Sequence, residues 1–233
     1  MNSIVTNEDC MIGMARYPDK YFELAIVDPP YGINADKSFV RKTPAIDKRN
    51  GRPMHTKPKL TGNWDAKRPD NEYFKELMRV TKNQIIFGGN YYADLLTAKS
   101  CWIVWDKVNG ASDQADCELA WTSFNTAVRK VEYMWTGLLQ AVSTARGRYS
   151  QGDKRDCENR IHPTQKPVAL YTWLLKNYAK QGDKILDTHL GSGSSRIAAY
   201  KAGFDFTGFE LDKDYFDAQE KRFKIFTDQT TLL

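Results

Sequence analysis

The chain has 233 residues, 41% of them hydrophobic, and a formal net charge of +5, so it is mildly basic and long enough for one α/β domain with its own core. No stretch approaches the roughly 18 apolar residues of a membrane helix, and the N-terminus lacks the charged-then-apolar pattern of a signal peptide. The four cysteines lie far apart without a Cys-x-x-Cys pair, which argues against a zinc site and a disulfide framework, so we expect a cytoplasmic protein without a metal.

Strands and helices alternate along the predicted chain. In chain order we expect a strand over 3–6, a helix over 9–17, a strand over 24–27, a helix over 73–80, a strand over 84–88, a helix over 91–99, a strand over 101–105, helices over 118–124 and 166–181, a strand from 184, a helix over 196–202, a strand over 206–212 and a tail helix over 214–227. This alternation predicts a mostly parallel sheet with helices on both faces, whose ligands bind at the carboxyl ends of the strands.

The first predicted site follows the strand over 24–27, which ends in Asp28-Pro29-Pro30-Tyr31. The two prolines donate no backbone N–H and keep the turn stiff and extended. Two carbonyls and one carboxylate are therefore left as acceptors beside an aromatic ring, an arrangement that can bind an amine on a flat heterocycle. The plainer interpretation is that the prolines only end the strand while Asp28 caps the next segment and Tyr31 packs. A second motif downstream favours the binding interpretation.

The second motif is a short strand that leads into the turn Gly191-Ser192-Gly193, after which a helix begins. Glycines let the chain turn tightly and bring its backbone against a ligand. The next strand ends at Glu210, 17 residues after Gly193, where a carboxylate can accept both hydroxyls of a ribose. Arg196 stands where the dinucleotide fingerprint has its third glycine, so an adenosyl ligand without phosphates fits better than a dinucleotide.

In the order of these motifs the chain resembles the DNA methyltransferases that methylate exocyclic amines with S-adenosylmethionine, in their permuted arrangement with Asp-Pro-Pro-Tyr first and the cofactor Gly-x-Gly last. The resemblance covers nearly the whole chain, because Asn7-Glu8-Asp9-Cys10 is similar to the family's Gly-Asp-Cys cofactor element and the segment from His162 to Pro167 is similar to the one before its cofactor strand. The chain departs from the family at Asp187-Thr188-His189, where Asp-Pro-Phe is usual.

The resemblance implies a single methyltransferase domain over 1–233 with a Rossmann-like fold. It implies S-adenosylmethionine as the cofactor, S-adenosylhomocysteine as the product and double-stranded DNA as the partner. The implied catalytic residues are Asp28, Pro29, Pro30 and Tyr31. The implied cofactor-binding residues are Asp9, Cys10, Asp28, Lys166, Asp187, His189, Gly191, Ser192, Gly193, Ser194, Glu210 and Leu211.

A basic loop at about 34–68 follows the first motif. Eight basic residues and one acid, Asp47, lie between Lys37 and Lys59, with no periodicity. Loops longer than about 12–15 residues are usually functional or disordered. We predict an arm that contacts DNA phosphates, a plain solvated loop being the alternative. A small target-recognition segment is expected at about 124–160, and the predicted DNA-binding residues of both regions are Lys37, Arg41, Lys42, Lys48, Arg49, Arg52, Lys57, Arg146 and Arg148.

The predicted reaction is methyl transfer to the N6 amine of an adenine that has been flipped out of the duplex. Asp28 and the Pro29 carbonyl would accept the two amine protons, and Tyr31 would replace part of the lost base stacking. By resemblance, Asp rather than Ser at position 28 indicates adenine. Two alternatives stay open: a cytosine-N4 or RNA-base methyltransferase, and an inactive DNA-binding subunit in which His189 weakens the cofactor pocket. The sequence also leaves open a cognate restriction endonuclease and the choice between monomer and homodimer.

Overall fold

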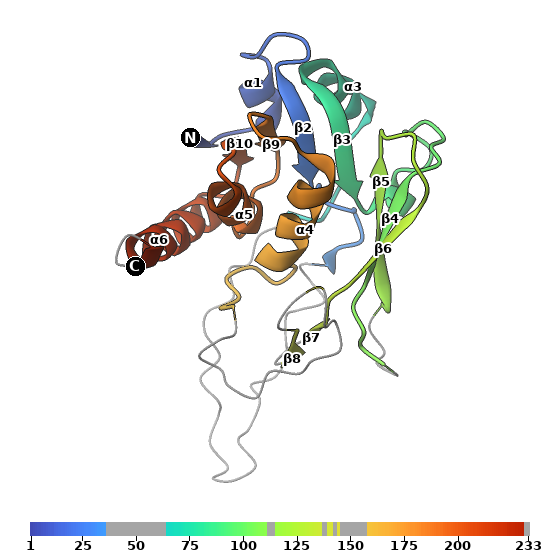
Figure 1. Ribbon diagram of the computed structural model, residues 1–233. Coiled ribbons are helices and arrows are strands. Elements are labelled where there is room, and N and C mark those ends of the chain that lie inside the picture. The colour runs from blue at the N-terminus through green and yellow to red at the C-terminus, as the bar shows by residue number, and fades with distance from the viewer. Residues whose placement is uncertain (36–63, 111–114, 137–138, 142–143, 145–157, 231–233) are drawn as a thin grey trace.

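The computed structural model describes residues 1–35, 64–110, 115–136, 139–141, 144 and 158–230, and within these ranges an eight-stranded sheet forms the middle of the molecule (Figure 1). The strands lie in the order β1 (Ser3–Asn7), β10 (Asp205–Glu210), β9 (Lys184–Asp187), β2 (Phe22–Val27), β3 (Thr81–Phe87), β5 (Cys117–Thr122), β4 (Trp102–Asp106) and β6 (Arg129–Glu132). Neighbouring strands are parallel except at β5, which is antiparallel to β3 and to β4. The expected mostly parallel sheet is therefore confirmed.

Helices cover both faces of this sheet (Figure 1). One face carries α1 (Cys10–Met14) and α3 (Asn71–Val80), and the other carries α4 (Val168–Tyr178) and α5 (Ser194–Ala202). Helix α6 (Lys213–Thr230) packs beside α5, β1 and β10. A short 3-10 helix, η1 (Gly89–Tyr91), follows β3, and a separate two-stranded sheet pairs β7 (Trp135–Thr136) with β8 (Leu139–Gln140).

Strand β2 is buried on both faces because its side chains alternate between the two helical layers. Leu24 and Ile26 belong to the core under α4 and α5, whereas Ala25 and Val27 belong to the core under α1 and α3. A strand covered on both faces has a continuous apolar sequence. Parallel pairing with β9 and β3 then brings the carboxyl end of β2 to the same edge of the sheet as theirs.

Two of the expected helices are wrong. Most of the segment 118–124 belongs to β5. Glu118-Leu119-Ala120 favours a helix by propensity, but Trp121 pairs with β3 and β4, Thr122 pairs with β3, and both side chains are buried there. The segment 91–99 forms the end of η1 and a series of turns. Its Tyr92 side chain is fully buried, and its Thr97 carbonyl accepts the indole N–H of Trp121. Contacts distant in sequence decide the conformation of both segments.

The other expected elements are present and differ only at their ends, whereas β6, β7 and β8 were not expected. Helix α1 is shorter than expected: the side chain of Asp9 caps its first turn by accepting the Met11 N–H, and the helix ends at Met14. Helix α4 begins after Pro167, and α5 ends at Gly203, which has the left-handed conformation that favours glycine. None of the helices in the described ranges combines the length and apolar character needed to cross a bilayer.

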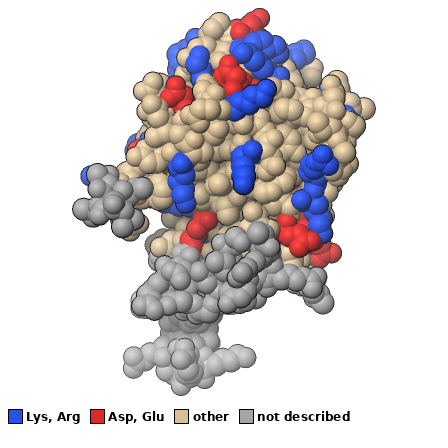
Figure 2. Space-filling model, viewed as in Figure 1, with Lys and Arg blue, Asp and Glu red and all other residues tan. Residues whose placement is uncertain are grey.

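The basic residues expected to contact DNA cannot be compared with the structure. Lys37, Arg41, Lys42, Lys48, Arg49, Arg52, Lys57, Arg146 and Arg148 lie outside the described residues. On the face seen in Figure 2, the described Lys and Arg side chains stand singly across the middle or are mixed with acidic ones, and they form no continuous basic patch there. Their contribution to DNA binding stays a prediction.

Candidate active site

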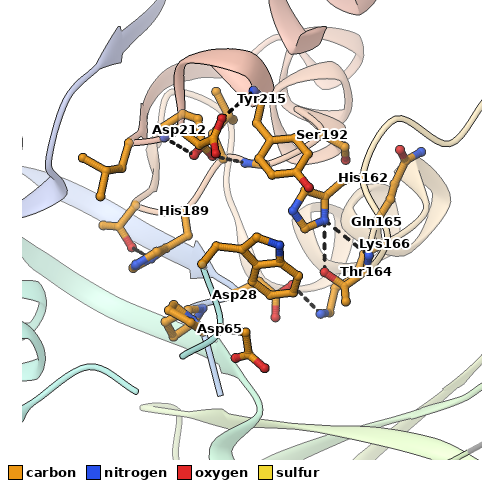
Figure 3. Close-up of a pocket in the computed structure, with 18 of the residues that line it drawn as sticks. Asp28, Asp65, His162, Thr164, Gln165, Lys166, His189, Ser192, Asp212 and Tyr215 are labelled. Carbon is orange, nitrogen blue, oxygen red and sulfur yellow. Dashed lines mark hydrogen bonds and ion pairs between the residues drawn. The ribbon is translucent and has the colours of Figure 1, made fainter. Parts of the chain in front are cut away.

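A cavity of about 460 Å³ lies at the carboxyl ends of β1, β2, β9 and β10 (Figure 3). It brings together the two motifs that the sequence separates by about 160 residues, because the parallel strands that carry them end at the same edge. The predicted site residues that line it are Asp9, Cys10, Asp28, Pro29, Pro30, Tyr31, Lys166, His189, Gly191, Ser192, Glu210 and Leu211. Most of the predicted site is therefore one physical cavity.

Three predicted cofactor residues do not line the cavity. Asp187 is buried behind the turn, where its carboxylate accepts the His189 N–H at 3.0 Å and the Ser195 hydroxyl at 2.5 Å. Burial raises the pKa of Asp187 to about 7. Gly193 is the left-handed residue before α5, and the Ser194 hydroxyl lies 3.1 Å from that of Ser192. These residues shape the turn from behind.

Glu210 is held by the backbone of the glycine turn. Its carboxylate accepts the Gly191 N–H at 2.7 Å and the Asp212 N–H at 2.9 Å. Burial raises the pKa of Glu210. Two backbone donors fix the carboxylate while each oxygen keeps a free lone-pair direction. Glu210 can therefore accept the hydroxyls of a ligand such as a ribose.

Two histidines in the cavity are neutral. His162 lies between Tyr215, at a ring separation of 4.2 Å, and Trp64, at 5.0 Å, and burial lowers its pKa to about 3. Burial lowers the pKa of His189 to about 4, and the rings of His189 and Tyr73 pack in a T-shaped arrangement with their centroids 5.4 Å apart. A neutral imidazole at position 189 is an aromatic ring of the kind that the family's usual Phe supplies, although it also carries a polar nitrogen.

The Asp28 turn is braced by tyrosines. The Tyr31 hydroxyl donates to Asp28 Oδ1 at 2.8 Å, and the Tyr31 ring stacks on Tyr91 with centroids 4.8 Å apart. The buried Tyr92 hydroxyl donates to the carbonyls of Pro29 and Pro30 at 2.9 and 2.6 Å. The carbonyls are acceptors, as the prolines imply, but they share the single proton of the Tyr92 hydroxyl. An incoming amine would use their second lone pairs.

A chain of buried charges ends at Asp28. Lys166 Nζ lies 2.5 Å from Asp28 Oδ2 and 3.1 Å from Glu118 Oε2, and its side chain is only 3% exposed. Lys107 Nζ lies 2.7 Å from the other oxygen of Glu118. Burial raises the pKa of Asp28, and Lys166 offsets part of that rise. Burial alone would lower the pKa of Lys166, but the carboxylates of Asp28 and Glu118 outweigh it and raise that pKa.

Asp65 clamps the chain just after the Asp28 turn. Its carboxylate, almost fully buried, accepts the Gly32 N–H at 2.9 Å and the Ala35 N–H at 2.7 Å, and its own carbonyl accepts the Asn34 N–H. Residues 32–35 are thereby fixed against residue 65.

Sequence reasoning missed several of these residues. Glu118 was assigned to a helix, and its place in the cavity follows from the insertion of β5 between β3 and β4. Tyr92 was also assigned to a helix. One local signal could have placed Glu118 on a strand. The run that contains it ends in Trp121 and Thr122, and both residue types favour strands. Within the described residues no group of three or more His, Cys, Asp or Glu side chains is arranged to hold a metal ion.

Comparisons with known proteins find a family whose model matches the chain. The model of the DNA methylase family N6_N4_Mtase matches residues 99–221. The type II methyltransferase M2.DpnII of Streptococcus pneumoniae is 39% identical over 61 residues, which are 26% of this chain and 23% of that protein, so the match spans about a quarter of that protein's length.

Solved structures share the fold. The structure of M1.HpyAVI in complex with SAM has a TM-score of 0.53 at 18% identity, covering 94% of this chain and 98% of that chain. The PvuII DNA methyltransferase, which is cytosine-N4-specific, has a TM-score of 0.55 at 14% identity, covering 98% of this chain and 91% of that chain. At these identities the likeness shows the fold alone.

Gly88 allows a test of how tightly the Asp28 turn is packed. Gly88 and Gly110 both have positive φ, of 68° and 64°, but a Cβ added at Gly88 would lie 2.3 Å from the Tyr31 ring, whereas one added at Gly110 would meet nothing within 4 Å. Both Gly→Ala variants should lose about 1 kcal/mol of unfolding free energy through backbone strain. Gly88→Ala should lose more, because Tyr31 must move. Equal losses in urea unfolding would show that Tyr31 is not confined by this glycine.

Proposed function

The chain belongs to the DNA methylase family whose model matches more than half of it, and we propose that it transfers the methyl group of S-adenosylmethionine to the N6 amine of an adenine flipped out of double-stranded DNA. The observation that carries the proposal is the single cavity that joins the Asp28 turn to the glycine turn and Glu210. One end of the cavity offers acceptors for an amine, and the other offers an acceptor for ribose hydroxyls.

The charge of the cavity suits a cationic cofactor. Among its described lining residues there are seven carboxylates, and Lys166 is the one Lys or Arg side chain. The sulfonium of S-adenosylmethionine is a permanent cation, so a negative lining with two neutral histidines attracts it. Gly191 leaves its side of the turn open, because a Cβ there would find its nearest neighbour 3.9 Å away. Glu210 and the backbone of the glycine turn would hold the adenosyl part.

The reaction needs a better nucleophile than a free aromatic amine. S-adenosylmethionine supplies an electrophilic methyl group, so that the N–C bond forms from the nitrogen lone pair while the C–S bond breaks and leaves its electrons on sulfur. Asp28 accepts a hydrogen bond from the amine and stabilises the positive charge that nitrogen carries until a proton leaves. The Pro29 carbonyl orients the amine, and the fixed turn supplies alignment.

The choice of target base rests on Asp28. Asp at the first position of the motif favours adenine N6 by resemblance, while the likeness to the cytosine-N4-specific PvuII enzyme makes cytosine N4 the second candidate. We propose that Lys37, Arg41, Lys42, Lys48, Arg49, Arg52, Lys57, Arg146 and Arg148 contact DNA phosphates.

Methyl transfer from labelled S-adenosylmethionine to unmethylated DNA, followed by nucleoside analysis, tests the function. We expect labelled N6-methyladenine. N4-methylcytosine would select the second candidate, labelling of RNA alone would change the substrate class, and the absence of product would favour a DNA-binding subunit without activity.

Replacing Asp28 tests the catalytic end of the cavity. Asp28→Ala should abolish transfer, because the amine loses its charged acceptor, while calorimetry should find cofactor affinity nearly intact. Asp19→Asn removes a surface carboxylate paired with Arg79 and should keep full activity. Retention of more than about a tenth of the rate by Asp28→Ala, a barrier change under about 1.4 kcal/mol, would contradict the role of Asp28.

Replacing Glu210 tests the cofactor end. Glu210→Ala should weaken S-adenosylmethionine binding by about 1.5–3 kcal/mol, since hydrogen bonds to a charged acceptor are the stronger kind. Glu72→Ala, which removes an exposed carboxylate on α3, is the matched control and should leave the dissociation constant unchanged. Equal affinities in the two variants, measured by calorimetry, would refute the assignment of Glu210.

A further inference from the structure

We propose that Lys166 and Glu118 are positioning residues for methyl transfer: Lys166 holds the Asp28 carboxylate in place, and Glu118 cancels the positive charge of Lys166 so that Asp28 still presents negative charge to the target amine. The inference rests on the proposed function, because it takes Asp28 as the group that faces the amine. It assigns Lys166 a different task from the cofactor contact that the sequence suggested.

The ammonium of Lys166 is surrounded by oxygens of the protein. It is ion-paired with Asp28 Oδ2 at 2.5 Å and with Glu118 Oε2 at 3.1 Å, and it donates a hydrogen bond to the Tyr31 hydroxyl at 3.2 Å. Tyr31 in turn donates to the other oxygen of Asp28, so two hydrogen bonds and one ion pair join Lys166, Tyr31 and Asp28. These contacts hold the ammonium of Lys166 at the Asp28 end of the cavity.

These contacts hold the carboxylate of Asp28 by both oxygens. Tyr31 holds Oδ1 and Lys166 holds Oδ2, which stops rotation of the carboxylate and leaves its remaining lone pairs for the amine. Lys166 reaches this position from the segment just before α4, far from β2 in sequence. A carboxylate that is already oriented needs no rearrangement when charge develops on nitrogen.

Lys166 alone would neutralise the negative charge of Asp28. A carboxylate and an ammonium 2.5 Å apart form a neutral pair, which attracts a developing cation only weakly. Glu118 is paired with the same ammonium, so the group of Asp28, Lys166 and Glu118 carries one net negative charge, and the balancing charge of Lys107 lies on the other oxygen of Glu118. Lys107 holds the far oxygen of Glu118, and although burial would raise the pKa of Glu118, Lys166 and Lys107 outweigh it and lower that pKa. Glu118 therefore stays ionised beside the site.

The rate of transfer should report this arrangement through its dependence on pH. The charged and titratable groups that act on Asp28, or on which Asp28 acts, are Lys166, Glu118, Tyr31, Tyr92, Tyr171 and Asp187. Lys166 lowers the pKa of Asp28 and Glu118 raises it. The rate should fall at low pH, along its acid limb, where Asp28 becomes protonated. Removing the charge of Lys166 should move this fall to higher pH, and removing the charge of Glu118 should move it to lower pH.

The test is single-turnover methyl transfer as a function of pH, with saturating DNA and cofactor. Lys166→Met should move the acid limb to higher pH by about one unit, because Asp28 then faces Glu118 without the cation. Glu118→Gln should move it to lower pH and reduce the plateau rate about tenfold, because the Asp28–Lys166 pair is then neutral. The double variant removes both charges together, and its plateau should exceed that of Glu118→Gln.

Three further measurements separate positioning from a structural or cofactor-binding role. Lys166→Arg keeps the cation and should restore the acid limb of the wild type. Lys82→Met removes an exposed lysine paired with Glu23 and should change nothing. Cofactor affinity should stay within about threefold of wild type in Lys166→Met, since the ammonium of Lys166 is paired with Asp28 and Glu118 rather than directed at the cofactor.

A carbon-13 NMR titration of the Asp28 carboxyl gives a test that does not depend on turnover. The Asp28→Asn variant assigns the signal. The pKa of Asp28 should be lower in Glu118→Gln than in the wild type. Unmoved acid limbs, or a loss of cofactor binding in Lys166→Met, would overturn the inference while leaving the proposed function intact. A wild-type protein that methylates no DNA, or an active Asp28→Ala variant, would instead refute the proposed function itself.

Discussion

The parallel pairing of β2 with β9 is the constraint on which the site depends. Leu24 is opposite Ile185 and Ala25 is opposite Leu186, and this register brings Asp28 and the glycine turn to one edge of the sheet. A slip of one residue would turn the side chains of β2 to the wrong helical layers, so burial on both faces enforces the register. The geometry of the cavity is thus a consequence of core packing.

The two ends of the cavity differ in their electrostatics. The acidic lining and neutral histidines favour a cationic sulfonium, whereas the Asp28 end concentrates a carboxylate whose orientation is fixed by Tyr31 and Lys166. Buried charges are expensive unless they are paired and hydrogen-bonded, and here every member of the chain from Asp28 to Lys107 has an opposite charge beside it. This pairing lets the four charges stay buried beside the cavity.

The sequence was informative where the signal was local. The apolar strand before Asp28, the glycine turn and the acid at Glu210 each combine a strand end with a distinctive turn, and all three lie where expected. Glu118 could not be found in this way, because Glu-Leu-Ala favours a helix and only the antiparallel insertion of β5 makes it a strand. Lys166 lines the cavity as expected, but its ion pairs with Asp28 and Glu118 could not be predicted, since they join segments that are distant in the chain.

The Asp65 clamp has a consequence for how such a protein can change. Residues 32–35 and residue 65 are bonded to each other, so the stretch between them begins and ends at fixed points. The free energy of closing a loop rises only slowly with its length. The contacts of the Asp65 clamp depend only on the residues at its two ends, so a change in the length of the chain between them costs the clamp little. This makes the clamp a suitable position for grafting a foreign segment beside a cavity.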